Sequence, residues 1–239
     1  MRAVGVIPGK REVRLMEHQT PKIAEPSQVK IRSLEVGVCG TDREICTFVY
    51  GSPPDGFDYL VLGAGPVGIL GAMLLLVNGF KTCVYSRSRA PNPKSELLES
   101  IGAKYISCEV ETVDQLAERI GNIDLVYEAV GTAKISYDVL RVLGLNGIYV
   151  FTGIPAPKPP IGIDADIIMR NLVLKNQVAV GTVNADRKAF AGAIRDLGVF
   201  LKRWPTALRS LITGRYKIDQ YRELLLGKAS GIKNVIAMV

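Results

Sequence analysis

The pattern of apolar and polar positions changes once along this chain, near residue 58. Up to residue 57, short runs in which apolar and polar residues alternate are separated by the breakers PGK, TPK and EPSQ. Alternation with a period of two predicts short, half-buried antiparallel strands, here in RAVGVI, VRLME and QVKIRSLEVGVC. From residue 58 on, apolar runs of strand length alternate with segments of helix length, which predicts right-handed βαβ units and a parallel sheet.

The region after residue 57 therefore predicts a doubly wound α/β fold. Its expected strands are residues 58–63, 81–86, 103–107, 123–131, 146–153 and 172–182. Its expected helices are residues 66–78, 92–102, 112–121, 133–144, 164–171 and 185–204. The tail GIKNVIAMV, residues 231–239, predicts one more strand.

The stretch GAGPVG, from Gly63 to Gly68, matches the G-x-G-x-x-G pattern and stands between an expected strand and an expected helix. In that context Gly63 permits a tight turn, Gly65 lets the backbone approach a pyrophosphate, and Gly68 lets the helix pack close to the strand. The pyrophosphate then faces the free N–H groups at the start of the helix. The pattern predicts a dinucleotide site; the alternative is a doubly wound domain with a vestigial turn.

The end of the second expected strand indicates which dinucleotide is bound. An NAD site usually has an acidic residue there for the ribose 2′-hydroxyl. From Ile69 to Ser95 the chain has no acidic residue, and the strand ends in Ser86, Arg87, Ser88 and Arg89. Hydroxyl and guanidinium groups suit a 2′-phosphate, so NADP is favoured and NAD remains possible. The alternative is that these arginines are merely solvated.

Composition narrows the class of protein further. The formal net charge is +7, but the 30 Lys and Arg residues are spread along the chain, so we expect no nucleic-acid partner. The uncharged run from Tyr59 to Phe80 is long enough to span a bilayer. Because glycines and Pro66 interrupt this run near its start, a buried strand, turn and helix is favoured over a membrane segment.

The cysteines and the first residues of the chain bear on localisation. The four cysteines, at positions 39, 46, 83 and 108, form no C-x-x-C pair, so neither a zinc ribbon nor a redox dithiol is indicated. The stretch MRAVGVIPGKREVRL lacks the apolar core of a secretory signal. We therefore expect a cytoplasmic protein with free thiols.

Three segments carry a resemblance to a known family. With VGVCGTDREI at residues 36–45, YGSPPDGFDYLVLG at 50–63 and GTVNADR at 181–187, the chain resembles the archaeal-type glucose 1-dehydrogenases. These belong to the medium-chain, zinc-dependent alcohol dehydrogenase superfamily. CGTD and G-x-G-x-x-G are shared by the whole superfamily, whereas CGTDREI and the VN after the last Rossmann strand are more particular to the glucose enzymes. The resemblance runs over nearly the whole chain.

The resemblance implies a fold, an activity and partners. Residues 1–57 would be the remnant of a truncated, mostly β GroES-like catalytic domain, and residues 58–205 a Rossmann dinucleotide-binding domain. Residues 206–239 would be a C-terminal helix and strand that return to the catalytic domain. The implied activity is an NADP-dependent aldose dehydrogenase, which moves a hydride from the anomeric carbon of a sugar to NAD(P) with zinc as a Lewis acid. We expect a homo-oligomer, since a truncated β domain would expose strand edges.

The resemblance also assigns roles to residues. Cys39 of CGTD would be a catalytic zinc ligand, and Thr41 would help to contact the sugar. The cofactor would be held by Gly65, Pro66, Val67 and Gly68 at the turn, by Ser86, Arg87 and Ser88 at the 2′-phosphate, and by Thr152, Gly153, Ile154, Thr182, Val183 and Asn184 beside the nicotinamide. Asn184 would also lie near the sugar.

One departure from the family pattern weakens the predicted zinc site. The family continues its version of DYLVLG with a His-Glu pair that supplies further zinc ligands, whereas this chain passes from Gly63 directly to Ala64. The only histidine, His18, matches no ligand position. Because a catalytic zinc needs about three protein ligands, we expect that the zinc is not retained. The four residues LVLG occur in both family segments that meet here. A deletion between two such short repeats would leave one copy of LVLG at the junction. The alternative to an active enzyme is an inactive NADP-binding module or truncated pseudo-enzyme, associated with an intact relative.

Overall fold

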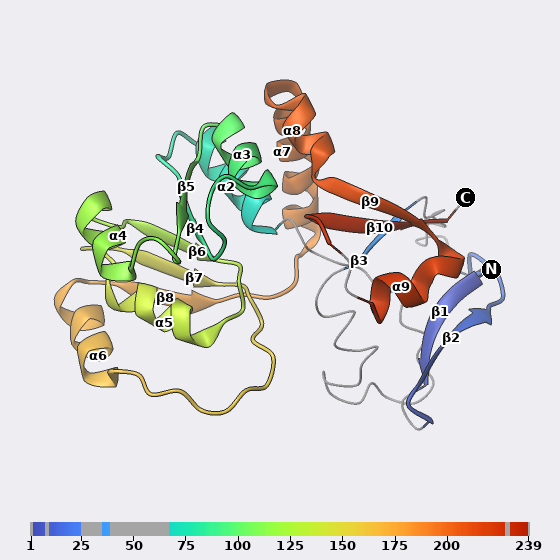
Figure 1. Ribbon diagram of the computed structural model, residues 1–239, viewed down its shortest axis with the longest axis horizontal. Helices are drawn as coiled ribbons and strands as arrows, with labels where there is room; N and C mark the ends of the chain where they lie inside the picture. The colour runs from blue at the N-terminus through green and yellow to red at the C-terminus, as the bar shows by residue number, and fades with distance from the viewer. Residues whose placement is uncertain (1, 8–9, 25–34, 39–66, 228–229, 239) are drawn as a thin grey trace. The chain divides into compact units, whose positions relative to one another are not determined.

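The computed structural model of the chain describes residues 2–7, 10–24, 35–38, 67–227 and 230–238 (Figure 1). The chain divides into two compact units. We call residues 67–208 the central unit, and residues 1–66 together with 209–239 the terminal unit. The expected strand at residues 58–63 and the junction between Gly63 and Ala64 lie outside the described residues.

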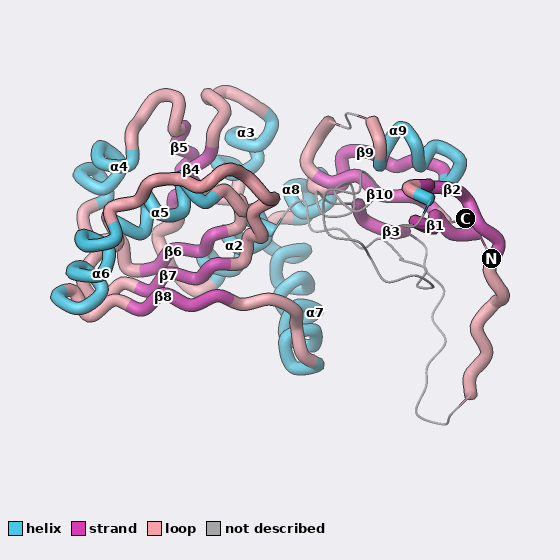
Figure 2. Tube along the Cα trace, turned by 90° about the horizontal axis from the view of Figure 1, so that it is seen from below, coloured by secondary structure: helices cyan, strands magenta, loops and turns pink. Residues whose placement is uncertain are grey.

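The described strands of the central unit are all parallel to their neighbours. Strand β4 (Cys83–Ser86) pairs with β5 (Lys104–Ser107). Strand β7 (Ile148–Phe151) lies between β6 (Leu125–Glu128) and β8 (Val178–Gly181), as Figure 2 shows. These pairings reproduce the 3-2 and 4-5-6 portions of the doubly wound strand order 3-2-1-4-5-6. The predicted α/β class is confirmed.

Helices follow the strands of this unit, and capping boxes mark the starts of two of them. The side chain of Asn92 accepts the backbone N–H of Ser95, whose hydroxyl accepts the N–H of Asn92 in return. Thr112 and Gln115 form the same reciprocal pair one helix later. Each such cap stabilises a helix by about 0.5–2 kcal/mol. The helices are α2 (Val67–Val77), α3 (Pro93–Ser100), α4 (Val113–Ile120), α5 (Ala133–Arg141), α6 (Ala165–Leu174), α7 (Arg187–Arg203) and α8 (Pro205–Ser210).

A buried aromatic ring organises one core of the central unit. Tyr149 of β7 is 1% exposed and packs in a cluster with Ile123, Leu140 and Leu143. Its hydroxyl donates to the carbonyl oxygen of Ser136, at 2.9 Å. Burial raises the pKa of Tyr149, so the hydroxyl stays protonated and keeps this hydrogen bond.

One predicted strand begins later than expected. Residues 172–174, which we expected to open a strand, are the last turn of helix α6, and β8 begins only at Val178. The Asp164 side chain caps the start of this helix by accepting the N–H of Ile167, and Asn176 ends the segment with a φ of 49°. The prediction was wrong because a short apolar run such as LVL fits a helix end as well as a strand.

The terminal unit is built from both ends of the described chain. Strands β1 (Arg2–Ile7) and β2 (Glu12–Glu17) form an antiparallel hairpin. Strand β10 (Lys233–Ala237) lies between β3 (Glu35–Val38), to which it is antiparallel, and β9 (Ile212–Lys217), to which it is parallel. Strand β9 was not expected from the sequence. It is followed by the single-turn η2 (Ile218–Gln220) and by α9 (Tyr221–Leu225).

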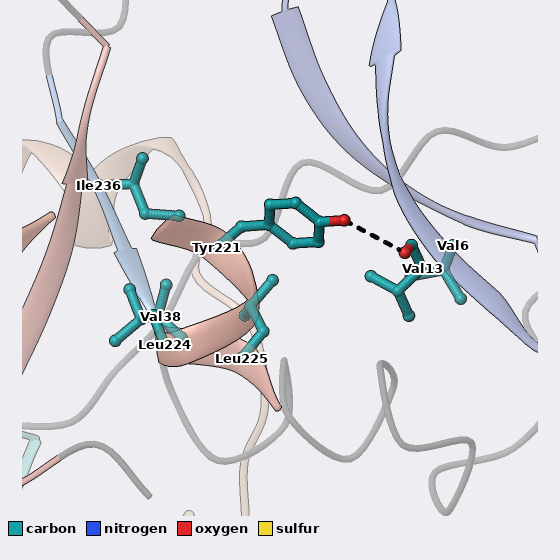
Figure 3. Close-up of a cluster of buried hydrophobic side chains, with 7 residues drawn as sticks. All are labelled: Val6, Val13, Val38, Tyr221, Leu224, Leu225 and Ile236. Carbon is teal, nitrogen blue, oxygen red and sulfur yellow. Dashed lines mark hydrogen bonds between the residues drawn. The ribbon is translucent and has the colours of Figure 1, made fainter. Parts of the chain in front are cut away.

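Helix α9 closes the apolar core of the terminal unit (Figure 3). Tyr221, Leu224 and Leu225 point from the helix toward the hairpin and the sheet, and Leu224 is fully buried. The Tyr221 hydroxyl reaches the carbonyl oxygen of Val13 at 3.5 Å. The rest of the cluster comes from the four strands β1, β2, β3 and β10 and consists of Val6, Val13, Val38 and Ile236. The core therefore needs residues from both ends of the chain.

Membrane insertion was the alternative for the uncharged run that starts at Tyr59. The described part of this run forms α2, which has 11 residues. Within the described ranges, no helix has both the length and the apolar character needed to cross a bilayer.

Candidate dinucleotide-binding site

The carboxyl ends of the parallel strands bring the predicted cofactor residues to the edge of the sheet where such folds bind ligands. In the register of the central unit, Ser86 of β4 lies opposite Ser107 of β5. Likewise, Glu128, Phe151 and Gly181 lie side by side at the ends of β6, β7 and β8. We call residues 86–89, 129–132, 152–154 and 182–184, which begin at or directly after these strand ends, the carboxyl-edge loops.

The first turn of α2 contains the only part of the predicted glycine turn that the structure describes. Val67 and Gly68 open the helix, whereas Gly63, Gly65 and Pro66 lie outside the described residues. A Cβ on Gly68 would lie 4.0 Å from the Cβ of Ala129, an ordinary contact. A Cβ on Gly71, one turn later, would lie 2.5 Å from the Tyr127 ring. The glycine of α2 that leaves no room for a side chain against β6 is therefore Gly71 rather than Gly68, and sequence reasoning missed it.

The loop after β4 is held by hydrogen bonds from β5. The carbonyl oxygen of Arg87 accepts from the Ser107 hydroxyl at 2.9 Å, and that of Ser88 accepts from the Tyr105 hydroxyl at 2.6 Å. The carbonyl oxygen of Ser86 accepts the N–H of Cys108 at 2.8 Å. Three consecutive carbonyl oxygens are thus engaged by one neighbouring segment, which leaves the side chains of the loop to meet a ligand.

The charge of this loop is basic, with one carboxylate nearby. Arg87 is exposed, and Arg89 is 71% exposed with its Nε 4.0 Å from Glu109 Oε2. An exposed pair at that distance contributes little, so the guanidinium stays available to another anion. Glu109 belongs to the segment after β5 and lies beyond the stretch from Ile69 to Ser95 that has no acidic residue. Two guanidinium groups and two hydroxyls remain a donor set that fits a phosphate.

The loops after β6 and β7 are joined by a buried carboxylate that sequence reasoning did not single out. Glu128, the last residue of β6, is 6% exposed. Its Oε1 accepts the N–H groups of Val130 and Gly131 at 2.9 and 2.8 Å, and its Oε2 accepts the N–H of Gly153 at 3.0 Å. A signal was present in the sequence, because Glu128 is an acidic residue within the apolar run LVYEAVG.

The residues predicted to flank the nicotinamide lie on the ends of adjacent strands. Thr152, Gly153 and Ile154 follow β7, and the Thr152 hydroxyl donates to the carbonyl oxygen of Glu128 at 2.6 Å. Thr182 follows β8 and donates its N–H to the carbonyl oxygen of Phe151 at 3.0 Å. The next residues, Val183 and Asn184, are exposed, and Asn184 has a φ of 68°, which asparagine tolerates better than most residues.

Of the residues predicted to contact the sugar or the zinc, the structure describes only Asn184. Cys39 and Thr41 lie outside the described residues, directly after β3 of the terminal unit. Cys83 and Cys108 are exposed free thiols, and His18 is half-buried after β2. Among the described ranges, no three or more His, Cys, Asp or Glu side chains come together as a metal site would require.

The parallel strands of the central unit and its carboxyl-edge loops define a Rossmann-type α/β domain. Among solved structures with this fold is the glucose dehydrogenase of Haloferax mediterranei in complex with NADP, Zn and gluconolactone. It matches with a TM-score of 0.75 over 100% of this chain and 99% of that chain, at 18% sequence identity.

The family follows from the sequence comparisons. The model of the family described as "Glucose dehydrogenase C-terminus" matches residues 54–238, and the chain belongs to this family. The chain is 33% identical to glucose 1-dehydrogenase 1 of Caldivirga maquilingensis over 179 residues, which are 74% of this chain and 49% of the relative. It is 31% identical to the glucose 1-dehydrogenase of Thermoproteus tenax over 219 residues, 90% of this chain and 58% of the relative. The chain spans about half the length of the curated relatives it matches.

Proposed function

We propose that this chain binds NADP(H) at the carboxyl-edge loops and is an oxidoreductase of the NADP-dependent glucose (aldose) 1-dehydrogenase type. The observation that carries the proposal is the loop after β4, where Arg87 and Arg89 stand exposed on a backbone held by three hydrogen bonds from the β5 segment. The guanidinium groups, with the hydroxyls of Ser86 and Ser88, would hold the 2′-phosphate of the cofactor.

The rest of the cofactor would lie along the same edge. Gly63, Gly65, Pro66, Val67 and Gly68 would receive the pyrophosphate at the start of α2, where the helix N–H groups attract an anion. Residues 152–154 and 182–184 would flank the nicotinamide. NADP supplies the hydride acceptor, and an aldose, with glucose as the first candidate, supplies the hydride from its anomeric carbon.

The sugar side of the proposal rests on the named relatives. The relatives from Caldivirga maquilingensis and Thermoproteus tenax are named as glucose 1-dehydrogenases, and the Haloferax structure contains gluconolactone. In this chain Thr41 and Asn184 would contact the sugar, and Cys39 would remain as a single zinc ligand. We place residues 1–57, by resemblance, as the remnant of a GroES-like domain. We also propose a cytoplasmic homo-oligomer, in keeping with the exposed thiols of Cys83 and Cys108.

A second candidate is a non-catalytic NADP-binding module. It is supported by the passage from Gly63 to Ala64 without the His-Glu pair that the family has there. Such a module would keep the cofactor loops, which come after the junction, and would lack the ligands that complete a zinc site.

One set of measurements on the purified full chain tests both candidates. NADPH and NADH binding are titrated by nicotinamide fluorescence, zinc is measured by elemental analysis, and glucose-dependent reduction of NADP is followed by absorbance. We expect NADPH to bind more tightly than NADH, zinc to be substoichiometric and glucose oxidation to be weak. Failure to bind either dinucleotide would overturn the proposal, and full zinc-dependent turnover would overturn the incomplete zinc site. NADPH binding without any turnover would favour the non-catalytic module.

A further inference from the structure

We propose that Glu128 is the positioning residue that holds the loops after β6 and β7 in the shape the nicotinamide half of the cofactor requires. The inference rests on the proposed function, since it concerns the same NADP(H) site. It adds a residue that neither the glycine turn nor the resemblance to the family had assigned.

The side chain of Glu128 joins two loops that are distant in the sequence. One carboxylate oxygen accepts the N–H groups of Val130 and Gly131, and the other accepts the N–H of Gly153. All three partners are donors, so the position requires a side chain that only accepts. A glutamine would direct its own N–H₂ group at one of these N–H groups, because one of its two polar atoms is a donor.

The backbone of Glu128 holds the second loop as well. Its carbonyl oxygen accepts the N–H of Thr152 at 3.0 Å and the Thr152 hydroxyl at 2.6 Å. Gly153 also donates to this carbonyl oxygen, at 3.2 Å. The start of the loop after β7 is thus hydrogen-bonded to both the main chain and the side chain of a single residue.

The two loops are packed backbone against backbone. A Cβ on Gly153 would lie 2.2 Å from the N atom of Gly131, and a Cβ on Gly131 would lie 2.7 Å from the carbonyl oxygen of Ile154. Gly131 also has a φ of 64°, which favours glycine. Because the two loops approach this closely, the Glu128 carboxylate accepts N–H groups from both of them, and these hydrogen bonds preorganise the site.

The inference predicts that Glu128 affects the binding of the nicotinamide half of the cofactor and not of the adenine half. The residues that hold the 2′-phosphate follow β4, whereas Glu128 acts on loops after β6 and β7. Adenosine 2′,5′-bisphosphate carries the adenine half and no nicotinamide. Loss of the carboxylate should therefore weaken the binding of NADPH and leave the binding of the bisphosphate unchanged.

The experiment compares Glu128→Gln with the wild-type full chain by calorimetric titration of both ligands. We expect NADPH to bind about tenfold or more weakly in Glu128→Gln, as for the loss of hydrogen bonds to a charged group. The bisphosphate should bind as in the wild type. The matched control is Glu111→Gln, which neutralises a carboxylate of 19% exposure that pairs with Arg119. It should change neither affinity.

Each other outcome has a distinct meaning. If the wild type binds neither ligand, the proposed function fails. If the wild type binds both and Glu128→Gln keeps the wild-type affinity for NADPH, the positioning role is overturned. If Glu128→Gln loses affinity for NADPH and for the bisphosphate equally, Glu128 has a general structural role, and the positioning role is overturned as well.

A milder variant covers the case in which Glu128→Gln does not fold. Thr152→Val removes only the hydroxyl that donates to the Glu128 carbonyl oxygen. We expect a smaller loss of NADPH affinity with the bisphosphate affinity unchanged. Wild-type affinity for NADPH in this variant would contradict the inference.

Discussion

The two units of this chain are assembled from contacts of different range. In the central unit, β4 pairs with β5, β6 with β7 and β7 with β8, so each described strand pairs with one that is next in the sequence. In the terminal unit, β10 pairs with β3 from near the other end of the chain, and Lys233 donates to the carbonyl oxygen of Val38 across 195 positions. Pairing across such a distance carries a larger loop-closure cost and slows folding.

The units also differ in the kind of interaction that stabilises them. The carboxyl-edge loops of the central unit are held by polar groups, chiefly Glu128, Ser107 and Tyr105. The terminal unit is held by an apolar cluster around α9. Because the described part of the proposed cofactor site lies within the central unit, damage to the apolar cluster should lower stability without removing the cofactor loops. Four predictions test this contrast.

The largest expected effect is in the terminal core. Leu224→Ala removes a fully buried side chain of α9 and should destabilise the terminal unit by about 2–5 kcal/mol. Urea unfolding followed by hydrogen exchange of the β10 amides measures the loss. The control Leu226→Ala changes a leucine that is 42% exposed and should cost less than about 1 kcal/mol. An equal loss of exchange protection in β6 and β7 would show that the two units unfold together and would break the comparison.

The next effect concerns the basic loop of the central unit. Arg87→Ala should weaken NADPH binding by about tenfold to a hundredfold and leave NADH binding nearly unchanged, because only NADPH carries the 2′-phosphate. Fluorescence titration with both dinucleotides gives the ratio. Arg195→Ala, at an exposed position on α7, is the matched control. Equal losses for NADPH and NADH would contradict the assignment of Arg87.

A smaller effect is expected from the strand that holds this loop. Tyr105→Phe keeps the ring but removes the hydroxyl that donates to the carbonyl oxygen of Ser88. We expect NADPH affinity to fall by about fivefold, as for one neutral hydrogen bond, with a smaller change for NADH. Tyr85→Phe, which removes a donor to the carbonyl oxygen of Glu111, serves as the control. An unchanged preference for NADPH over NADH in Tyr105→Phe would mean that the loop keeps its shape without this bond.

The smallest effect is expected from removing an exposed ion pair of the terminal unit, between Arg2 and Asp219. The hydrogen bond from Arg2 lowers the pKa of Asp219 below its usual value of 3.8. A lowered pKa in the folded state means that the pair stabilises the fold above the usual pKa and that this contribution is lost as pH falls through the folded pKa. Asp219→Asn should therefore reduce the dependence of stability on pH below about pH 4. The free energy of unfolding is measured against pH for both proteins. If it falls equally with pH in wild type and variant in that range, the ion pair does not stabilise the fold.

Local signals in the sequence anticipated the central unit better than the terminal one. Asn92 and Thr112 stand at the starts of α3 and α4, and each forms a capping box within its own helix start. The positions of β4 to β7 follow from apolar runs bounded by such helices. In contrast, β9 was missed, because its alternating pattern ITGRYK is short and gains its partner only through β10.

Some residues of the candidate site could likewise be predicted from local sequence, and others could not. Ser86 to Arg89 could be singled out because they follow a strand directly and contain no acidic residue. Glu128 could be noticed as an acidic residue in an apolar run, but its three N–H partners lie on two loops separated by a helix and a strand. No local pattern indicates that Gly131 and Gly153 meet.

The sequence by itself determined the order of the βα elements in the central unit, the capped starts of α3 and α4 and the basic loop after β4. It did so because periodicity, capping and turn chemistry act over a few neighbouring residues. Only the tertiary structure decided that β3 pairs with β10, that α9 closes the core and that Glu128 bridges two loops. These features depend on which atoms are buried together, and residues far apart in the chain supply those atoms.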